Sequence, residues 1–203
     1  SEMCIRDRDS ELLLELYAVE ADFSDSHPLL IGVAAEQGDV LSRDNIALLQ
    51  RITQDAWHLP LAYRVDSVTN YQHTEVDGDD LYVADLFPTD ITLDDDQFSR
   101  AQQVAITQQE VVGQLVSEDR RMAMVIVNFR FPDKDEYDSE VTKLMGEVDR
   151  LVEGYQRDFP ELTFAVSGRV AIDYGIQRIL KQDGSLLIPV SYTHLRAHET
   201  LNH

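Results

Sequence analysis

The stretch Arg121-Met-Ala-Met-Val-Ile-Val-Asn-Phe-Arg-Phe131 is the strongest strand signal in the chain, and it decides the class of fold. Residues 111–116 precede it across the polar turn Ser117-Glu-Asp-Arg120, which predicts a β-hairpin. Its apolar run is nearly continuous, and this is typical of a strand that is covered on both faces. We therefore expect an isolated chain to fold but to leave one sheet edge or face for another part of a longer protein to cover.

Further elements lie on both sides of this hairpin, and their order is regular. Apolar periodicity, the N-cap residue Ser42 and the helix-ending Pro60 and Pro160 place them. The expected elements are a helix at 10–22, a strand at 27–36, a helix from Ser42 to Pro60, a strand at 62–69, an extended piece at 80–87, a helix at 98–109, the hairpin, a helix at 138–158, a strand at 162–166 and a helix at 171–181.

Two strand–helix–strand units, at about 28–70 and 121–168, predict an α+β fold. Such units pair as a split βαβ arrangement, a ferredoxin-like mixed or antiparallel sheet with its helices on one face. An acidic segment and the hairpin are inserted between the units. One face of helix 138–158 is predicted to be core, and it consists of Val141, Leu144, Met145, Val148, Leu151, Val152 and Tyr155.

The two ends of the chain differ in character from the rest. Residues 1–8 and 190–203 resemble translated sequencing-adapter reads, and such segments are set aside before the fold is considered. We therefore expect one domain, residues 9–189, torn from a longer protein. An apolar run begins at Leu186, as it would where a membrane span follows.

Composition excludes several classes of function. The 203 residues carry a net charge of −21, with a pI near 4.4. A surface this acidic repels phosphate backbones and anionic lipid headgroups, so nucleic acid is not expected as a partner. The single cysteine, Cys4, lies in the adapter-like leader, so residues 9–189 offer neither a disulfide nor a thiolate metal site.

Two groups of residues suggest a metal at first sight. His194 and His198 have the i, i+4 spacing of a zinc site, and His203 follows one residue too late for a metalloprotease helix. All three lie in the adapter-like tail, so we expect no metal there. The acids 77–80 around Gly78 have glycine at the wrong position for a calcium loop, and we expect a solvated turn.

Candidates for catalysis are equally weak. Ser167 lacks the flanking glycine of a nucleophile elbow, and His58 and His73 stand alone in the sequence. The acids Asp94-Asp-Asp96 are explained by the dipole of the helix that follows them. The scattered glycines form no phosphate-cradling loop. We therefore predict that the chain is not an enzyme and takes no cofactor.

One stretch resembles a known family. Ala56-Trp-His-Leu-Pro60 leads into Tyr63-Arg-Val-Asp-Ser-Val-Thr-Asn70, and Asp77-Gly-Asp-Asp-Leu81 follows. This resembles the first extracytoplasmic loop of the resistance-nodulation-division (RND) exporters, in the branch of large lipid and hopanoid exporters. The matching positions are Leu59-Pro60, Arg64-Val65, Ser67, Thr69-Asn70 and Asp80-Leu81.

Two later stretches extend the resemblance. Gly113-Gln-Leu-Val-Ser-Glu-Asp119 precedes an apolar strand, as in the family, but this chain has Arg120 where the family has glycine, which puts the turn type in question. Val166-Ser-Gly168 and then 183–189 resemble the approach to the second membrane helix of these exporters. The segment 64–70 is interpreted as structural, a strand and turn that fix the subdomain.

The resemblance implies a porter domain on the periplasmic side of the inner membrane. Its partners would be the membrane helices and second extracytoplasmic loop of the same transporter, hydrophobic or amphiphilic cargo, and possible homo-oligomer contacts. The family's proton-carrying acids lie in membrane helices outside this chain, so no site residue is carried over. We expect a cleft between the two βαβ units that opens and closes.

Two alternatives remain open from the sequence. The first is a stand-alone ferredoxin-like module that binds or senses a ligand and is acidic for solubility. The second is a small-molecule enzyme on the same fold. A deep pocket that holds a carboxylate with a raised pKa would favour the enzyme. Membrane spans on both sides of residues 9–189 would favour the exporter.

Overall fold

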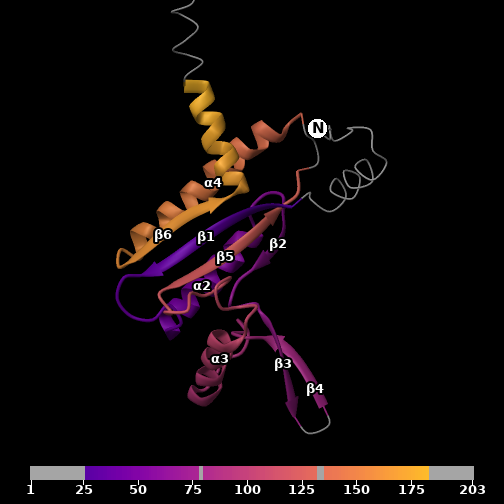
Figure 1. Ribbon diagram of the computed structural model, residues 1–203, viewed down its shortest axis with the longest axis vertical. Helices are drawn as coiled ribbons and strands as arrows, with labels where there is room; N and C mark the ends of the chain where they lie inside the picture. The colour runs from indigo at the N-terminus through magenta and orange to yellow at the C-terminus, as the bar shows by residue number, and fades with distance from the viewer. Residues whose placement is uncertain (1–25, 78–79, 132–134, 183–203) are drawn as a thin grey trace, which may run out of the picture.

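A four-stranded sheet in the order β2-β5-β1-β6 carries the fold (Figure 1). The computed structural model describes residues 26–77, 80–131 and 135–182. The sheet strands are β1 (His27–Ala35), β2 (Ala62–Asp66), β5 (Met122–Phe129) and β6 (Leu162–Gly168). Helix α2 (Arg43–Trp57) joins β1 to β2, and α4 (Tyr137–Asp158) joins β5 to β6.

Every neighbouring pair in this sheet is antiparallel. Strand β5 lies between β1 and β2, and β1 lies between β5 and β6, so each strand–helix–strand unit is split by a strand of the other. The predicted α+β class is confirmed. The two units interleave in one sheet, so the cleft that we expected between them does not form at their junction.

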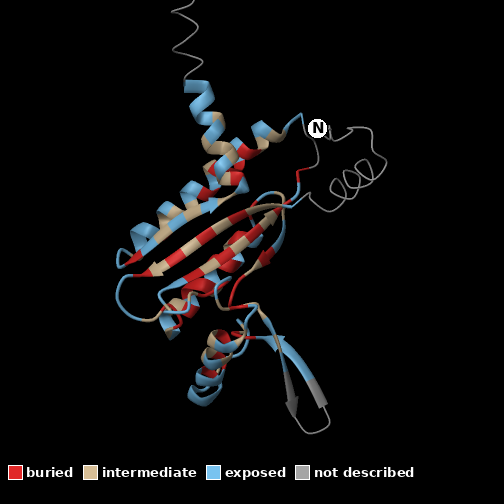
Figure 2. Cartoon of the chain, viewed as in Figure 1, coloured by how far each residue is buried: buried red, intermediate tan, exposed pale blue. Residues whose placement is uncertain are grey.

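The register assigns each face of the sheet a different environment. Leu29 lies opposite Val127, and Ile31 lies opposite Val125, and all four side chains are at most 1% exposed. The alternate residues along both strands are only half-buried, and Figure 2 shows this alternation of buried and intermediate positions. The buried face is the one that α2 and α4 cover, and in Figure 1 the sheet lies in front of these two helices.

The two covering helices follow the sequence signals closely. The Ser42 side chain caps α2 by accepting from the Asn45 N–H. Of the predicted core face of α4, five residues are buried, and Leu151 and Val152 are partly buried against the same core. Tyr155 joins the helices, because its hydroxyl donates to Asp55 of α2 at 2.5 Å.

A smaller lobe forms from the inserted segment. Strands β3 (Gln72–Asp77) and β4 (Asp80–Asp85) pair as an antiparallel ribbon, and α3 (Asp95–Thr107) packs beside them. In Figure 1 this lobe projects from one end of the sheet. Arg43 of α2 holds α3 through an ion pair with Asp95 at 2.7 Å.

Several boundaries differ from the prediction, each for a local reason. Strand β2 ends at Asp66 instead of at 69, because the chain turns there. Residues 111–116 are a compact turn with isolated bridges, not a strand, because the Val111 carbonyl accepts from N–H groups three to five residues later. Helix α3 starts at Asp95, because Asp94 and Gln97 form a capping box that the sequence analysis missed.

The last described element is a helix over residues 169–182, which extends the predicted 171–181. Four large apolar residues on it are more than half exposed, and they are Ile172, Ile176, Ile179 and Leu180. The predicted helix at 10–22 and both adapter-like ends lie outside the described residues.

Candidate functional site

The stretch that carries the family resemblance folds into a buried hydroxyl cluster. Ser67 is fully buried and Thr69 is 3% exposed, although both are polar. The Thr53 hydroxyl donates to Ser67 Oγ at 2.9 Å, and the Ser67 and Thr69 hydroxyls lie 2.8 Å apart. Because burying an unpaired hydroxyl costs about 1–3 kcal/mol, this mutual pairing is what permits three polar side chains in the core.

Asn70 closes the turn after β2. Its amide group donates to the Val65 carbonyl at 2.7 Å, and its Oδ1 accepts from the Ser67 N–H at 2.8 Å. Both bonds are local backbone contacts of the kind that asparagine uses to shape turns. The structural interpretation of residues 64–70 is therefore supported by their contacts.

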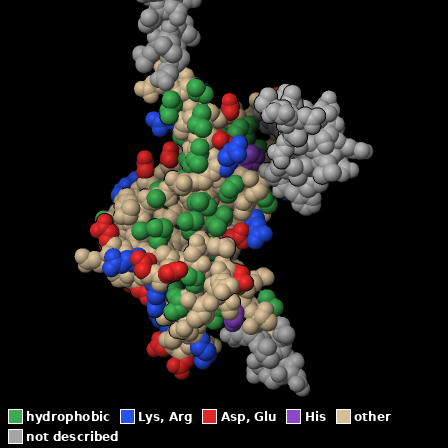
Figure 3. Space-filling model, in the orientation of Figure 1, with side chains coloured by type: hydrophobic (Ala, Val, Ile, Leu, Met, Phe, Trp, Pro, Cys, Tyr) green, Lys and Arg blue, Asp and Glu red, His purple; other side chains and the backbone are tan. Residues whose placement is uncertain are grey.

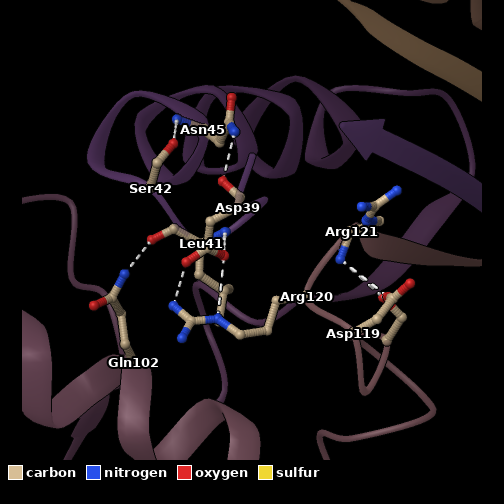
Figure 4. A network of polar contacts seen from close by, with 9 residues as sticks. Asp39, Leu41, Ser42, Asn45, Gln102, Asp119, Arg120 and Arg121 are labelled. Carbon is tan, nitrogen blue, oxygen red and sulfur yellow. Dashed lines mark hydrogen bonds and ion pairs between the residues drawn. The ribbon is translucent and has the colours of Figure 1, made fainter. Parts of the chain in front are cut away.

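The turn at 117–120 keeps a glycine-like backbone without glycine. Arg120 has φ = 58°, in the left-handed region that costs a side chain about 1 kcal/mol or more. Its guanidinium forms an ion pair with Asp39, with Nε 3.2 Å from Oδ1 (Figure 4). Its carbonyl accepts from the Val40 N–H at 2.9 Å. These contacts offset the strain, so the turn that seemed doubtful from the sequence is formed.

The neighbouring residues of the same turn are held by Ser117. Its hydroxyl donates to Asp119 at 2.6 Å, and its oxygen accepts from the Met122 N–H at 2.9 Å. The Ser117 hydroxyl and the Arg121 N–H stabilise the carboxylate and hold the pKa of Asp119 below its usual value. The turn therefore places β5 firmly against β1, and its residues are structural.

The sheet face that the helices leave uncovered is largely apolar. The register puts these small or apolar residues on it: Pro28, Leu30, Gly32, Ala34, Met122, Met124, Ile126 and Ala165. It also puts the polar residues Asn128, Thr163 and Ser167 on the same face. Met122 is 45% exposed and Ala165 is also exposed. Figure 3 shows hydrophobic side chains gathered over the sheet in the same view. We call this surface the open sheet face.

Two charged side chains of β2 lie at one edge of the open sheet face. Arg64 lies opposite Asn128 and Asp66 lies opposite Ile126, so both project on the open side. Arg64 Nε donates to the two carboxylate oxygens of Asp66 at 2.9 and 2.8 Å. The pair neutralises itself, and the open sheet face therefore presents apolar surface with a polar border.

A pocket of about 220 Å³ lies in the inserted lobe, between the β3–β4 ribbon and α3. Its wall is largely apolar, with Tyr82, Ala84, Leu86, Pro88, Ile91, Leu93, Ala101 and Val104. Tyr82 is 57% exposed and Ile91 is 60% exposed, so the wall is open to solvent on one side. Apolar walls with a few polar groups are typical of ligand sites.

Four polar side chains line the same pocket, namely His73, Asp85, Gln97 and Arg100. Gln97 is engaged in the capping box of α3. Within the part of the chain that the structure describes, Arg100 and Asp85 make no ion pair and no side-chain hydrogen bond. The pocket therefore offers one free cation and one free anion beside an apolar wall.

Two tyrosines of the core have raised pKa values, Tyr155, which is buried, and Tyr137, which is half-buried. Burial and the hydrogen bond to Asp173 raise the pKa of Tyr137, whose hydroxyl donates to that carboxylate at 2.6 Å. Burial and the Asp55 contact raise the pKa of Tyr155 in the same way. Both phenols stay protonated near neutral pH, and both join elements of the core, so they are structural donors and not candidate bases.

The two histidines, Ser167 and the acids before α3 lie on separate elements. His58 caps the end of α2, with Nδ1 2.7 Å from the Gln54 carbonyl. His73 lies on β3 and lines the pocket. Ser167 is exposed on β6. Asp94 is the N-cap of α3, and the two acids after it lie in the first turn, as expected.

Most of the metal candidates lie outside the described residues. Across the described ranges, no three histidine, cysteine or acidic side chains cluster as a metal site would require. Asp77 is the last residue of β3 and Asp80 is the first residue of β4. Residues 78–79 and the histidines at 194, 198 and 203 lie outside the described residues.

Comparison with known proteins gives no functional assignment for this site. No protein-family model matches the chain, and the search of curated proteins found no match. No described helix combines the length and apolar character needed to cross a bilayer. The pocket residues escaped the sequence analysis because they come from positions between 73 and 104, and only the apolar Ile91 and Leu93 within an acidic loop gave a signal.

Proposed function

We propose that this chain is the extracytoplasmic porter-domain part of a proton-driven exporter of the RND type, which passes hydrophobic or amphiphilic molecules. The proposal places the chain on the periplasmic side of the inner membrane. It assigns the chain conformational gating and no chemistry. It rests on the resemblance at 56–70, 113–119 and 166–168, where the residues supply turns and a buried polar cluster.

The observation that carries the proposal is the open sheet face. Met124 and Ile126 are half-buried, and they lie on the sheet face opposite to the one that α2 and α4 cover. Complete burial of each side chain would stabilise the covered state by on the order of 1 kcal/mol. In a porter domain the open sheet face would be covered, because the rest of the same transporter would pack against it.

Gating requires bodies that move as units. Here the sheet, α2 and α4 share one continuous core, and Tyr155 bonds across the two helices. Such a core resists bending and would transmit a rigid rotation. We assign the movement to the boundaries of this body, where the open sheet face meets the remainder of the transporter.

The source gene tests the proposal. The experiment is long-read sequencing of the locus across both ends of the reading frame. The proposal predicts roughly 20 apolar residues before the domain and a similar run continuing from Leu186. A frame that ends in a polar tail and a stop codon would contradict it.

The inserted pocket favours a second candidate, a stand-alone module that binds or senses a ligand. In that case the open sheet face would be covered by a second copy of the chain. Sedimentation of the isolated chain separates the two. A stable dimer that Ile126→Lys disrupts would favour the stand-alone module, whereas a monomer at micromolar concentration would favour the exporter fragment.

A further inference from the structure

The inserted lobe carries two exposed, unpaired charges of opposite sign beside one apolar wall. Arg100 projects from α3 and Asp85 ends β4, and both line the same pocket. The two do not form an ion pair with each other within 4 Å, and neither pairs with another described residue. Each charge is therefore free to meet a ligand.

Arg100 has an acidic neighbour on its own helix but does not pair with it. Asp96 lies one turn earlier on α3, at the spacing that usually allows an ion pair, yet none is formed. Five of the described lysines and arginines form an ion pair with another described residue, and Arg100 is one of those that do not. By contrast, Arg43 on the neighbouring pocket is paired with Asp95 and lies over the Phe98 ring.

An anionic headgroup would satisfy Arg100 but would be repelled by Asp85. A cationic headgroup would satisfy Asp85 but would be repelled by Arg100. A headgroup that carries both charges satisfies both residues, and an apolar chain attached to it matches the wall formed by residues such as Leu86, Leu93 and Val104.

We infer that this pocket binds a zwitterionic amphiphile, with the apolar chain against the wall, the anionic group at Arg100 and the cationic group at Asp85. The inference rests on the proposed function only where it makes this molecule cargo. Binding itself is a property of the chain, and it can be measured without the rest of an exporter.

The test uses the full 203-residue chain and four probes that share an octyl chain, each kept below its micelle-forming concentration. Octylphosphocholine is zwitterionic, octanoate is anionic, octyltrimethylammonium is cationic and octyl glucoside is uncharged. Isothermal titration calorimetry gives the Kd of each probe. We expect octylphosphocholine to bind most tightly.

Single substitutions test which pocket residue binds which charge of the probe. Arg100→Gln should weaken octylphosphocholine and octanoate about two- to fivefold, as expected for an exposed ion pair, and should not weaken octyltrimethylammonium. Asp85→Asn should do the reverse, weakening octylphosphocholine and octyltrimethylammonium. Arg157→Gln is the matched control, because it removes the same charge from an exposed arginine outside the pocket, and it should change none of the four.

Octyl glucoside binding as tightly as octylphosphocholine would overturn the inference, and so would Kd values that neither pocket variant changes. If no probe binds but the locus encodes flanking membrane spans, the binding site is excluded and the exporter proposal stands. If binding depends on charge but the locus encodes no spans, the binding site is supported and the role of its ligand as cargo is excluded.

Discussion

Replacing Gly168 by alanine tests the contact that joins β6 to the start of β1. Gly168 has φ = 97°, which alanine adopts at a cost of about 1 kcal/mol or more. A Cβ there would lie 2.5 Å from the Pro28 carbonyl oxygen and 3.1 Å from Leu29 Cα. These atoms belong to the β1 backbone, which is held in register with β5, so they cannot yield cheaply.

Overpacking of this kind typically costs about 1–3 kcal/mol. Together with the cost of the positive φ, Gly168→Ala should lower the free energy of unfolding by about 3 kcal/mol. Gly113→Ala is the control, because Gly113 has φ = 80° but nothing lies within 4 Å of its added Cβ. It should lose only about 1 kcal/mol. Urea denaturation followed by circular dichroism gives both free energies of unfolding. Losses within about 0.5 kcal/mol of each other would refute the reasoning.

Three further predictions concern the polar turn, the buried phenol and the helix glycines. Asn70→Ala should lose about 2 kcal/mol, because it orphans a carbonyl and an N–H after β2, and the urea midpoint measures this. Tyr155 has a folded-state pKa above the ordinary value of 10, so its contribution is complete below pH 10 and is lost as the pH rises from there. Tyr155→Phe should cost about 1 kcal/mol at pH 7 and show a shallower loss of stability above pH 10; an unchanged alkaline slope would exclude this phenol as a cause. Gly146 and Gly154 lie inside α4 with open space around their Cβ positions, so alanine at each should raise the free energy of unfolding by about 0.5–1 kcal/mol, and a loss at either site would contradict the helix geometry.

The elements with strong local signals were predictable. Helix α4 has a regular apolar face, and Ser42 is a favourable cap, so both helices of the main core follow from local rules. Strand β3 was missed because Gln72-His-Thr-Glu-Val-Asp77 shows no apolar alternation and pairs through its backbone with β4. The segment 111–116 looks like a strand, but Gly113 at positive φ bends it into a turn.

The candidate pocket could not be predicted for a different reason. Arg100 and Asp85 are separated in sequence, and each alone is an ordinary surface charge. Only the packing of α3 against the β3–β4 ribbon brings them to one cavity. The open sheet face was predictable in part, because the apolar run at 122–129 required cover on both faces, but the face that stays open depends on the side that α2 and α4 occupy.

The central claim is that another part of a larger protein covers the open sheet face. Thiol labelling tests it directly, because Cys4 is the only cysteine and can be changed to serine. Met124→Cys reports on the open sheet face, and Glu161→Cys on an exposed loop is the control. A maleimide should label both sites in the isolated chain. In the intact protein from the complete locus, we predict that position 124 is protected while position 161 still reacts. Equal labelling of position 124 in both proteins would contradict the account.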